Sequence, residues 1–211
     1  GRDNIISSLL IAASGQVHEV CIYFNGVLLR GNRSTKRSSD QFEAFESPND
    51  APLAHAGIQI EYKKRVLRPA SEEAFHFQPF KELPIGVIKI FPGIQFDYFA
   101  SLMTDKLKGV VLETFGAGNI PGSAQNALLP IIERAYQNGT IITVCSQCSQ
   151  GAVSLGTYAA SSALRRVGAV NGRDMTTEAA LAKSYYLLSI SDDMAFVKSQ
   201  MQKNLRGELT E

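Results

Sequence analysis

Three apolar runs in the second half of the chain constrain its fold more than any other feature. They cover residues 85–90, 109–112 and 140–144. Apolar residues recur at helical spacing between them, over 96–103 and again over 128–135. Strands that are apolar on both sides and alternate with helices form parallel sheets covered on both faces. The sequence therefore predicts a parallel α/β domain from residue 84 onwards.

The last part of the chain is predicted to be helical over 159–167, 177–188 and 192–205. Thr176 and Ser191 stand where N-caps are expected. The stripe of the last helix is interpreted as buried core rather than as a partner-binding face. Its members are Met194, Val197, Met201 and Leu205.

The first part of the chain has a different pattern. A helix is predicted over 3–13, and Asn25-Gly26 lies between two apolar runs as the turn of a β-hairpin. Phe42 and Phe45 predict a short helical turn, and alternation over 58–62 predicts a strand. The mixed, proline-containing stretch 63–83 is the best candidate for a linker. We therefore predict two domains, 1–83 and 84–211.

Size and charge narrow the class of protein. With 211 residues, 45% of them hydrophobic, the chain can bury a sizeable core. Its formal net charge of +1 gives no general attraction to nucleic acid or to an anionic membrane, and no apolar stretch reaches the roughly 20 residues needed to cross a bilayer. We expect a soluble cytoplasmic protein. Because Gly1 leads at once into an apolar helical pattern, we also expect further residues upstream.

The segment 30–36 directly follows the predicted hairpin and ends in Lys36. A rigid hairpin would hold this loop still. A lysine relays protons when burial or neighbouring charge keeps part of it neutral and a carboxylate connects it to a hydroxyl nucleophile. The alternative is that a loop rich in lysine and arginine is solvated surface.

Other chemical motifs are weaker. Cys145 and Cys148 form a Cys-x-x-Cys unit, but the first follows a buried strand directly, so redox chemistry is disfavoured. The three histidines are scattered without metal-ligand spacing, and no metal site is predicted. Loops after the strands, 113–121 and 146–151, lie where parallel sheets bind ligands. Tyr158 is interpreted either as a core phenol or as a hydrogen-bond donor at a subunit contact.

Six blocks of the sequence together resemble the cytoplasmic (type I) L-asparaginases. The blocks, which occur in the family's order along nearly the whole chain, are 29–36, 42–48, 113–119, 150–153, 172–183 and 205–210. The resemblance implies a two-domain α/β enzyme: the C-terminal part of a larger, parallel-sheet N-terminal domain, followed by a smaller parallel α/β domain. It also implies hydrolysis of L-asparagine to L-aspartate and ammonia without a cofactor, by a homotetramer built from intimate dimers.

The resemblance assigns roles to a few residues. In the family a threonine hydroxyl attacks the side-chain amide, and a second threonine, an aspartate and a lysine form a proton relay. Lys36 matches that lysine. Tyr158 matches a tyrosine offered to the active site of a neighbouring subunit. The family's two threonine-bearing segments do not occur in this chain, so we expect it to depend on the N-terminal portion of the same protein and to be inactive alone.

The resemblance also bears on regulation. Bacterial members bind asparagine at a second, allosteric site, and Cys148 matches a residue of that pocket. Glu113 stands where those enzymes have an arginine, as in animal-type members with the same Glu-Thr-Phe-Gly pattern. The change removes a cation that would pair with the ligand carboxylate, so regulation by this route is not expected.

Two other functions are compatible with the sequence. One is a non-catalytic interaction or regulatory module on the asparaginase fold. The other is an asparaginase-like subunit of a tRNA-dependent amidotransferase, which delivers ammonia to a partner. The second would need a basic RNA-contacting surface, and the near-neutral charge gives it little support.

Overall fold

The computed structural model describes residues 1–156 and 159–211. The chain forms two compact units. Unit 1 consists of Gly1–Phe77 together with Arg206–Glu208, and unit 2 consists of Gln78–Leu205 together with Leu209–Glu211. In the part of the chain that is described, no helix has the length and apolar character needed to span a bilayer.

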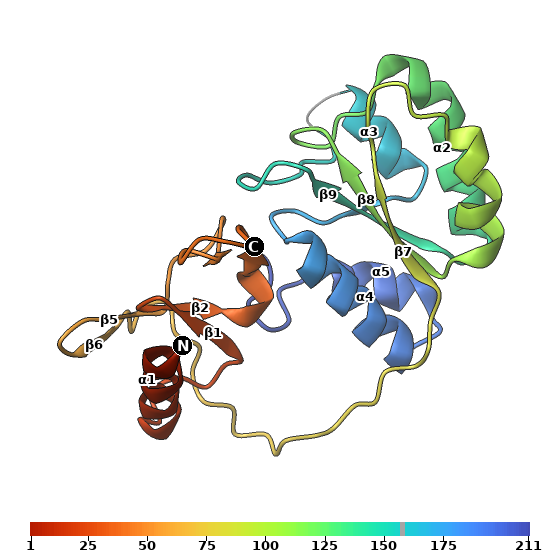
Figure 1. Ribbon diagram of the computed structural model, residues 1–211. Coiled ribbons are helices and arrows are strands. Elements are labelled where there is room, and N and C mark those ends of the chain that lie inside the picture. The colour runs from red at the N-terminus through yellow and green to blue at the C-terminus, as the bar shows by residue number, and fades with distance from the viewer. Residues whose placement is uncertain (157–158) are drawn as a thin grey trace. The chain divides into compact units, whose positions relative to one another are not determined.

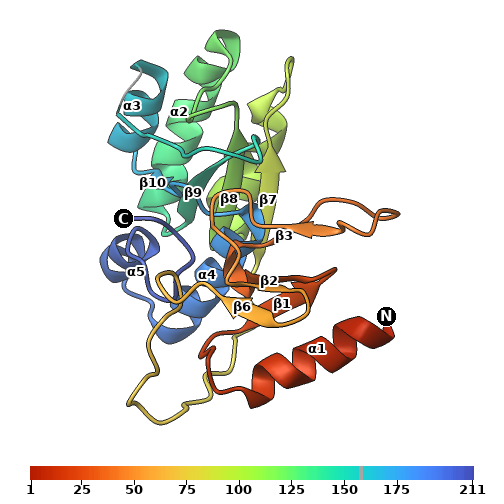
Figure 2. The same cartoon turned by 90° about the vertical axis from the view of Figure 1, so that its left-hand side faces the viewer.

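Unit 2 is built on a four-stranded parallel sheet. Its strands are β7 (Ile85–Lys89), β8 (Gly109–Thr114), β9 (Ile141–Ser146) and β10 (Val170–Asn171). They lie in the order β10-β9-β8-β7, which Figure 2 shows, and the register places Val111 of β8 between Val87 and Thr143. The parallel sheet predicted from the apolar runs is confirmed.

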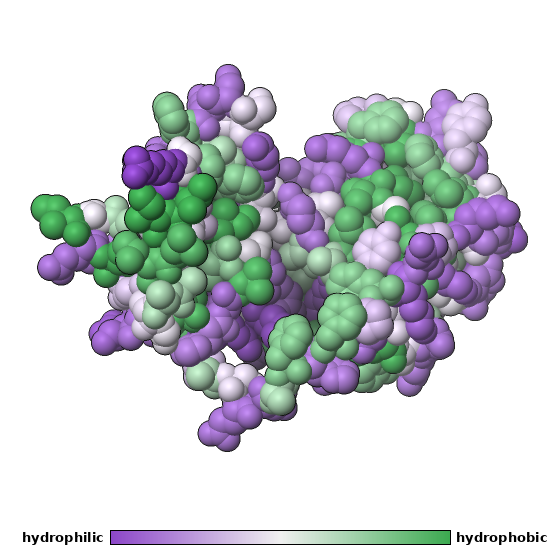
Figure 3. All heavy atoms as spheres, turned by 60° about the horizontal axis from the view of Figure 1, so that its bottom comes forward, coloured by the Kyte–Doolittle hydropathy of each residue, from purple (hydrophilic) through white to green (hydrophobic). Residues whose placement is uncertain are grey.

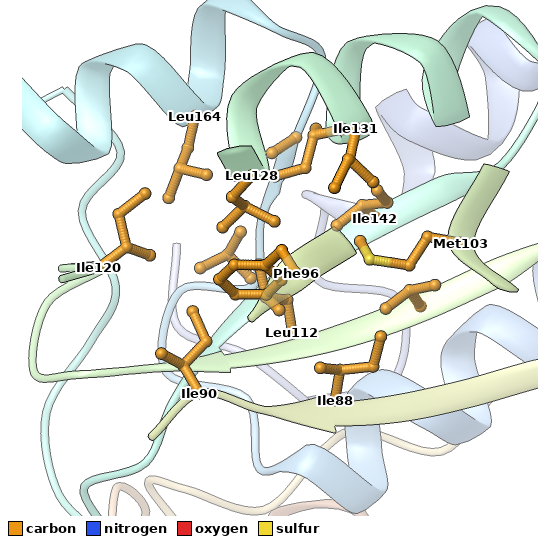
Figure 4. Close-up of a cluster of buried hydrophobic side chains, with 14 of the residues drawn as sticks. Ile88, Ile90, Phe96, Met103, Leu112, Ile120, Leu128, Ile131, Ile142 and Leu164 are labelled. Carbon is orange, nitrogen blue, oxygen red and sulfur yellow. The ribbon is translucent and has the colours of Figure 1, made fainter. Parts of the chain in front are cut away.

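Helices cover both faces of this sheet (Figure 1). One face carries α2 (Gly122–Gln137) and α3 (Ala159–Arg166), and the other carries α4 (Thr177–Ile190) and α5 (Met194–Met201). Alternate strand residues supply the two cores, so that Leu112 packs in one and Val111 in the other. In the first core Phe96, 1% exposed, lies amid aliphatic side chains of the sheet and α2 (Figure 4).

The helical segments of unit 2 differ in detail from the sequence prediction. The predicted helix 96–103 is instead the 3₁₀ turn Phe96–Phe99 followed by the π-helical turn Leu102–Lys106. The last helix covers Met194–Met201 and not the predicted 192–205, so Leu205 lies outside it. The predicted stripe still packs in the second core, with Val197 and Met201 fully buried. That helix is capped by Asp193, not Ser191, because the Asp193 carboxylate accepts hydrogen bonds from the next helical amides.

Unit 1 holds antiparallel strands. A four-stranded sheet has the order β1-β2-β5-β6 and a second sheet pairs β3 with β4; the strands are β1 (Cys21–Phe24), β2 (Val27–Arg30), β3 (Thr35–Lys36), β4 (Phe45–Glu46), β5 (Ala54–Ala56) and β6 (Ile60–Tyr62). The hairpin at Asn25-Gly26 is confirmed, with φ values of 49° and 78°. The helical turn predicted at Phe42 and Phe45 is wrong, because Phe45 is extended in β4 and pairs with Lys36 of β3.

The helix α1 (Arg2–Ala13) packs on unit 1 by only part of its surface. Ile11 is buried against Leu28, Leu53 and Ala54. Four large apolar side chains of the same helix are exposed: Ile5, Ile6, Leu9 and Leu10. Figure 3 shows apolar side chains gathered on this side of unit 1.

Candidate functional site

The lysine loop begins where β2 ends, and its first residue must be glycine. The N–H of Gly31 donates to the carbonyl of Val20 at 2.9 Å. A Cβ at this position would lie 2.8 Å from that carbonyl oxygen, which is closer than real side chains approach backbone. The close contact holds the 3₁₀ turn Gly31–Arg33 against the start of β1.

Lys36 lies at the end of this loop, in the short strand β3. Its partner across the β3–β4 pair is Phe45, and the Lys36 ammonium lies 5.1 Å from the centroid of that ring, within cation–π range. The Phe45 ring packs edge-on against Phe24 of β1 with centroids 5.5 Å apart. The side chain of Lys36 is exposed, and the strand that carries it is anchored to the rest of unit 1 by Phe45.

A buried ion cluster centred on Arg30 lies below the loop. The Arg30 guanidinium pairs with Glu19 at 2.5 Å and with Asp50 at 2.6 Å, and it also donates to the carbonyl of Val66 at 2.7 Å. Burial alone would raise the pKa of Glu19, but hydrogen bonds from Arg30 and the backbone N–H of Arg68 outweigh it, so the pKa lies below its ordinary value. Glu19 is therefore held ionised beneath β2.

Arg33 forms a second buried anchor. This residue is only 3% exposed, and its guanidinium donates to the carbonyls of Glu208 and Asn49 at 2.9 Å and 2.8 Å. The next residue, Ser34, donates through its hydroxyl to the carbonyl of Arg30 at 2.7 Å. The loop is therefore fastened on several sides just before Lys36.

Glu113 lies near the carboxyl end of β8 in unit 2, and its carboxylate is already engaged. One oxygen accepts a hydrogen bond from the hydroxyl of Thr177 at 2.6 Å, and the other lies 3.9 Å from the ammonium of Lys89. The carboxamide of Gln147 donates to the main-chain carbonyl of Glu113 at 2.9 Å. An anion-binding role is thus opposed by a carboxylate placed at the first turn of α4.

Cys145 and Cys148 lie in different environments. Cys148 is exposed after β9, whereas Cys145 is buried within the strand. Burial raises the pKa of the Cys145 thiol to about 12, so that thiol stays protonated. Over residues 1–156 and 159–211, no group of three potential metal-ligating side chains comes together. Tyr158 lies outside the described residues.

Sequence reasoning missed the two arginines that hold the lysine loop. A loop rich in basic residues is usually solvated, and that general rule is wrong here for Arg30 and Arg33, both less than one-tenth exposed. A usable signal was present, because 29–36 and 205–210 both belong to the blocks that resemble asparaginases. The structure brings these two blocks together through the bond between Arg33 and Glu208.

Two family models match most of the chain. A family model described as "Glutaminase/Asparaginase C-terminal domain" matches residues 84–201, and one described as "Asparaginase, N-terminal" matches residues 1–68. The chain belongs to the asparaginase family. It is 39% identical to L-asparaginase 1 of Escherichia coli over 210 residues, which cover all of this chain and 62% of that protein.

Other relatives carry different names. The chain is 39% identical to the 60 kDa lysophospholipase of Homo sapiens over 214 residues, or 36% of that protein. It is 30% identical to a subunit of the glutamyl-tRNA(Gln) amidotransferase of Pyrococcus abyssi, covering 98% of this chain and 48% of that one. Among solved structures, L-asparaginase I of Vibrio cholerae superposes with a TM-score of 0.85 at 41% identity, covering 92% of this chain and 58% of that chain. The chain thus spans about three-fifths of the length of the L-asparaginases of E. coli and V. cholerae.

Proposed function

We propose that the protein to which this chain belongs hydrolyses L-asparagine to L-aspartate and ammonia, with Lys36 in the proton relay. The observation that carries the proposal is the match of both asparaginase family models, because the Lys36 block lies inside the N-terminal match. Relatives named L-asparaginase align over the whole chain. The Lys36 side chain is exposed in this chain, and the loop that leads to it is held by buried contacts of Arg33 and Ser34, which supports precise positioning of the lysine.

The chemistry divides between this chain and the N-terminal portion of the same protein. A threonine hydroxyl from that portion attacks the side-chain amide carbon of asparagine, ammonia leaves, and water then releases aspartate from the ester. A second threonine and an aspartate, also from that portion, connect the hydroxyl to Lys36, which takes up the proton; the relay returns it to the amide nitrogen, which leaves as ammonia. Residues 1–83 belong to the catalytic domain in this proposal, and residues 84–211 form the C-terminal domain.

The proposal extends to assembly and regulation. We place Tyr158 at the active site of a neighbouring subunit in a homotetramer of intimate dimers, and the protein in the cytoplasm. The positions matching the allosteric pocket, Glu113 and Cys148, lack the arginine that would receive the carboxylate of a second asparagine. Because the Glu113 carboxylate bonds Thr177 and lies near Lys89, we expect no activation by asparagine through this site.

The test is ammonia release from asparagine by two proteins. One is this chain alone, which we expect to be inactive. The other is the protein expressed from its complete reading frame, which we expect to be active and to lose at least about a thousandfold in kcat on Lys36→Ala. Turnover by this chain alone, or full activity of the Lys36→Ala protein, would overturn the proposal.

The amidotransferase function is the second candidate, because three relatives are named as subunits of such an enzyme. It predicts tighter binding of tRNA than a net charge of +1 provides. A gel-shift titration with tRNA at low salt separates the two, since an asparaginase should show no specific complex. The absence of both a complex and turnover in the complete protein would leave a non-catalytic interaction module.

A further inference from the structure

The segment Arg206–Glu208 is packed into unit 1, far along the sequence from the rest of that unit. Gly207 and Glu208 are buried. The segment is bonded to the lysine loop: Arg33 donates to the carbonyl of Glu208, and the Asn32 carboxamide donates to the carbonyl of Arg206, both at 2.9 Å. Segments outside helices and strands are usually mobile unless something ties them down. We call Arg206–Glu208 the clasp.

The fit between the clasp and the loop leaves no room for a side chain. Gly207 has a φ of +85°, a conformation that favours glycine. A Cβ built there would lie 3.0 Å from both Cδ and Nε of Arg30. The clasp therefore rests directly on the guanidinium stem that the Glu19 and Asp50 carboxylates hold in place.

Hydrogen bonds within the clasp and between the residues that flank it set its shape. The N–H of Arg206 donates to the Glu208 carboxylate at 2.6 Å, which closes a tight turn. On either side of the turn, the Asn204 carboxamide donates to the carbonyl of Leu209 at 2.8 Å. The Glu208 carbonyl is consequently presented to Arg33 by a preformed turn.

The position of Lys36 depends on these contacts because only two residues separate it from Arg33. The second arm of the Arg33 guanidinium holds the carbonyl of Asn49, in the segment that follows β4. The planar fork of Arg33 thus joins the clasp to the segment that directly follows β4, the strand that pairs with β3. A shift at Arg33 would be passed along the extended backbone to Lys36.

We propose that Arg33 is a positioning residue for Lys36 and that the clasp is its fixed support. The inference rests on the proposed function only in giving Lys36 a catalytic purpose. The physical claim is that Arg33 and Gly207 act together to hold β3 in place.

Hydrogen–deuterium exchange of this chain tests the physical claim without any need for activity. Arg33→Lys keeps the charge but cannot reach both carbonyls, and Gly207→Ala pushes the clasp off Arg30. Each should speed exchange in peptides covering 31–37 by about tenfold, with β5–β6 unchanged. Asp174→Asn is the matched control, since it weakens the bonds that Thr210 makes to Asp174 within unit 2.

The combined variant sharpens the test. If Arg33 and Gly207 act as one unit, Arg33→Lys with Gly207→Ala should exchange little faster than either single variant. Additive effects, or exchange in 31–37 unchanged in both single variants, would overturn the inference. If Arg33→Lys unfolds unit 1 as a whole, Gly207→Ala still tests the contact, because it removes no buried polar group.

Activity of the protein from its complete reading frame supplies the functional readout. Arg33→Lys should lower kcat about tenfold with KM changed less than about twofold, because it misplaces a proton-relay group and not a substrate contact. Asp174→Asn should change neither. Faster exchange at 31–37 with Lys36→Ala fully active would keep the clasp and reject the hydrolase, whereas equal loss of kcat in Arg33→Lys and Asp174→Asn would reject the positioning role.

Discussion

Unit 1 and unit 2 are stabilised in different ways. Unit 2 buries two apolar cores, one on each face of a parallel sheet that helices cover on both sides. Unit 1 has a small apolar cluster of four fully buried residues, and its interior also holds the ion cluster of Arg30 and the fork of Arg33. Unit 2 therefore depends on packing, whereas unit 1 depends on a few directional bonds that lose much when one partner is removed.

The largest effect should come from the packed core of unit 2. Phe96→Ala should lower the free energy of unfolding by about 3 to 5 kcal/mol, because it removes a ring that is 1% exposed at the centre of the first core. Urea unfolding followed by circular dichroism measures the loss. Phe91→Ala is the matched control at a half-exposed ring and should cost less than about 1 kcal/mol. Equal losses would mean that the two rings are packed alike.

Removing one charge from the ion cluster of unit 1 should lower the stability of the chain. Glu19→Gln should lower stability at neutral pH by about 2 to 3 kcal/mol, because Arg30 stays buried with Asp50 as its remaining ionic partner. The pKa of Glu19 is lowered in the folded chain, so its ionised form stabilises unit 1 above the ordinary glutamate range. That contribution is lost as pH falls through the lowered pKa.

The gap between Glu19→Gln and the parent should consequently shrink from neutral to strongly acidic pH. Urea titrations at several pH values, monitored by exchange within unit 1, measure it. A gap that stays constant or widens on acidification would contradict the assignment. Glu61→Gln, at an exposed glutamate of β6, serves as the control and should change stability by less than about 0.5 kcal/mol.

A smaller effect is expected at the start of α5 in unit 2. Asp193→Ala removes the side chain that accepts from the amides of Ala195 and Phe196, and should cost about 1 kcal/mol. Ser191→Ala should cost at most about 0.5 kcal/mol, as Ser191 caps no helix N-terminus. The two unfolding midpoints compare them directly. A larger loss of stability for Ser191→Ala would mean that Ser191 caps the helix, as the sequence spacing predicts.

The smallest effect on stability should be found on the exposed side of α1. Leu9→Gln changes a side chain that is 66% exposed, so the free energy of unfolding should move by no more than about 0.5 kcal/mol. Ile11→Gln, on the buried side of the same helix, is the contrasting variant and should destabilise unit 1 markedly. Light scattering should show less self-association for Leu9→Gln. Similar destabilisation by both variants would mean that both sides are covered.

Sequence patterns predicted what local rules determine. The runs at 109–112 and 140–144 became β8 and β9 because short apolar runs that alternate with helical patterns are typical of buried parallel strands. The hairpin at Asn25-Gly26 formed because its turn needs two positive φ values. Lys36 was found through a block of residues whose order resembles a family, and its catalytic role stays a prediction.

Patterns failed where distant partners decide the conformation. Phe45 is extended because it pairs with Lys36 across β3–β4, which helical spacing cannot reveal. The segment 96–106 forms short 3₁₀ and π turns, although Phe96 and Met103 pack in one core just as they would from a single α-helix, so their spacing does not distinguish the two. No local rule indicates that Arg33 will meet the carbonyl of Glu208, since 175 residues separate them.

That separation has a consequence for synthesis. At about 5 to 20 residues per second, the ribosome adds Glu208 on the order of 10 to 35 seconds after Arg33. Throughout that interval the guanidinium has yet to meet the carbonyl of Glu208, although the hairpin before it is complete. Translation therefore sets an order of assembly in which the turn bearing Lys36 reaches its final anchorage only after unit 2 has almost entirely been made.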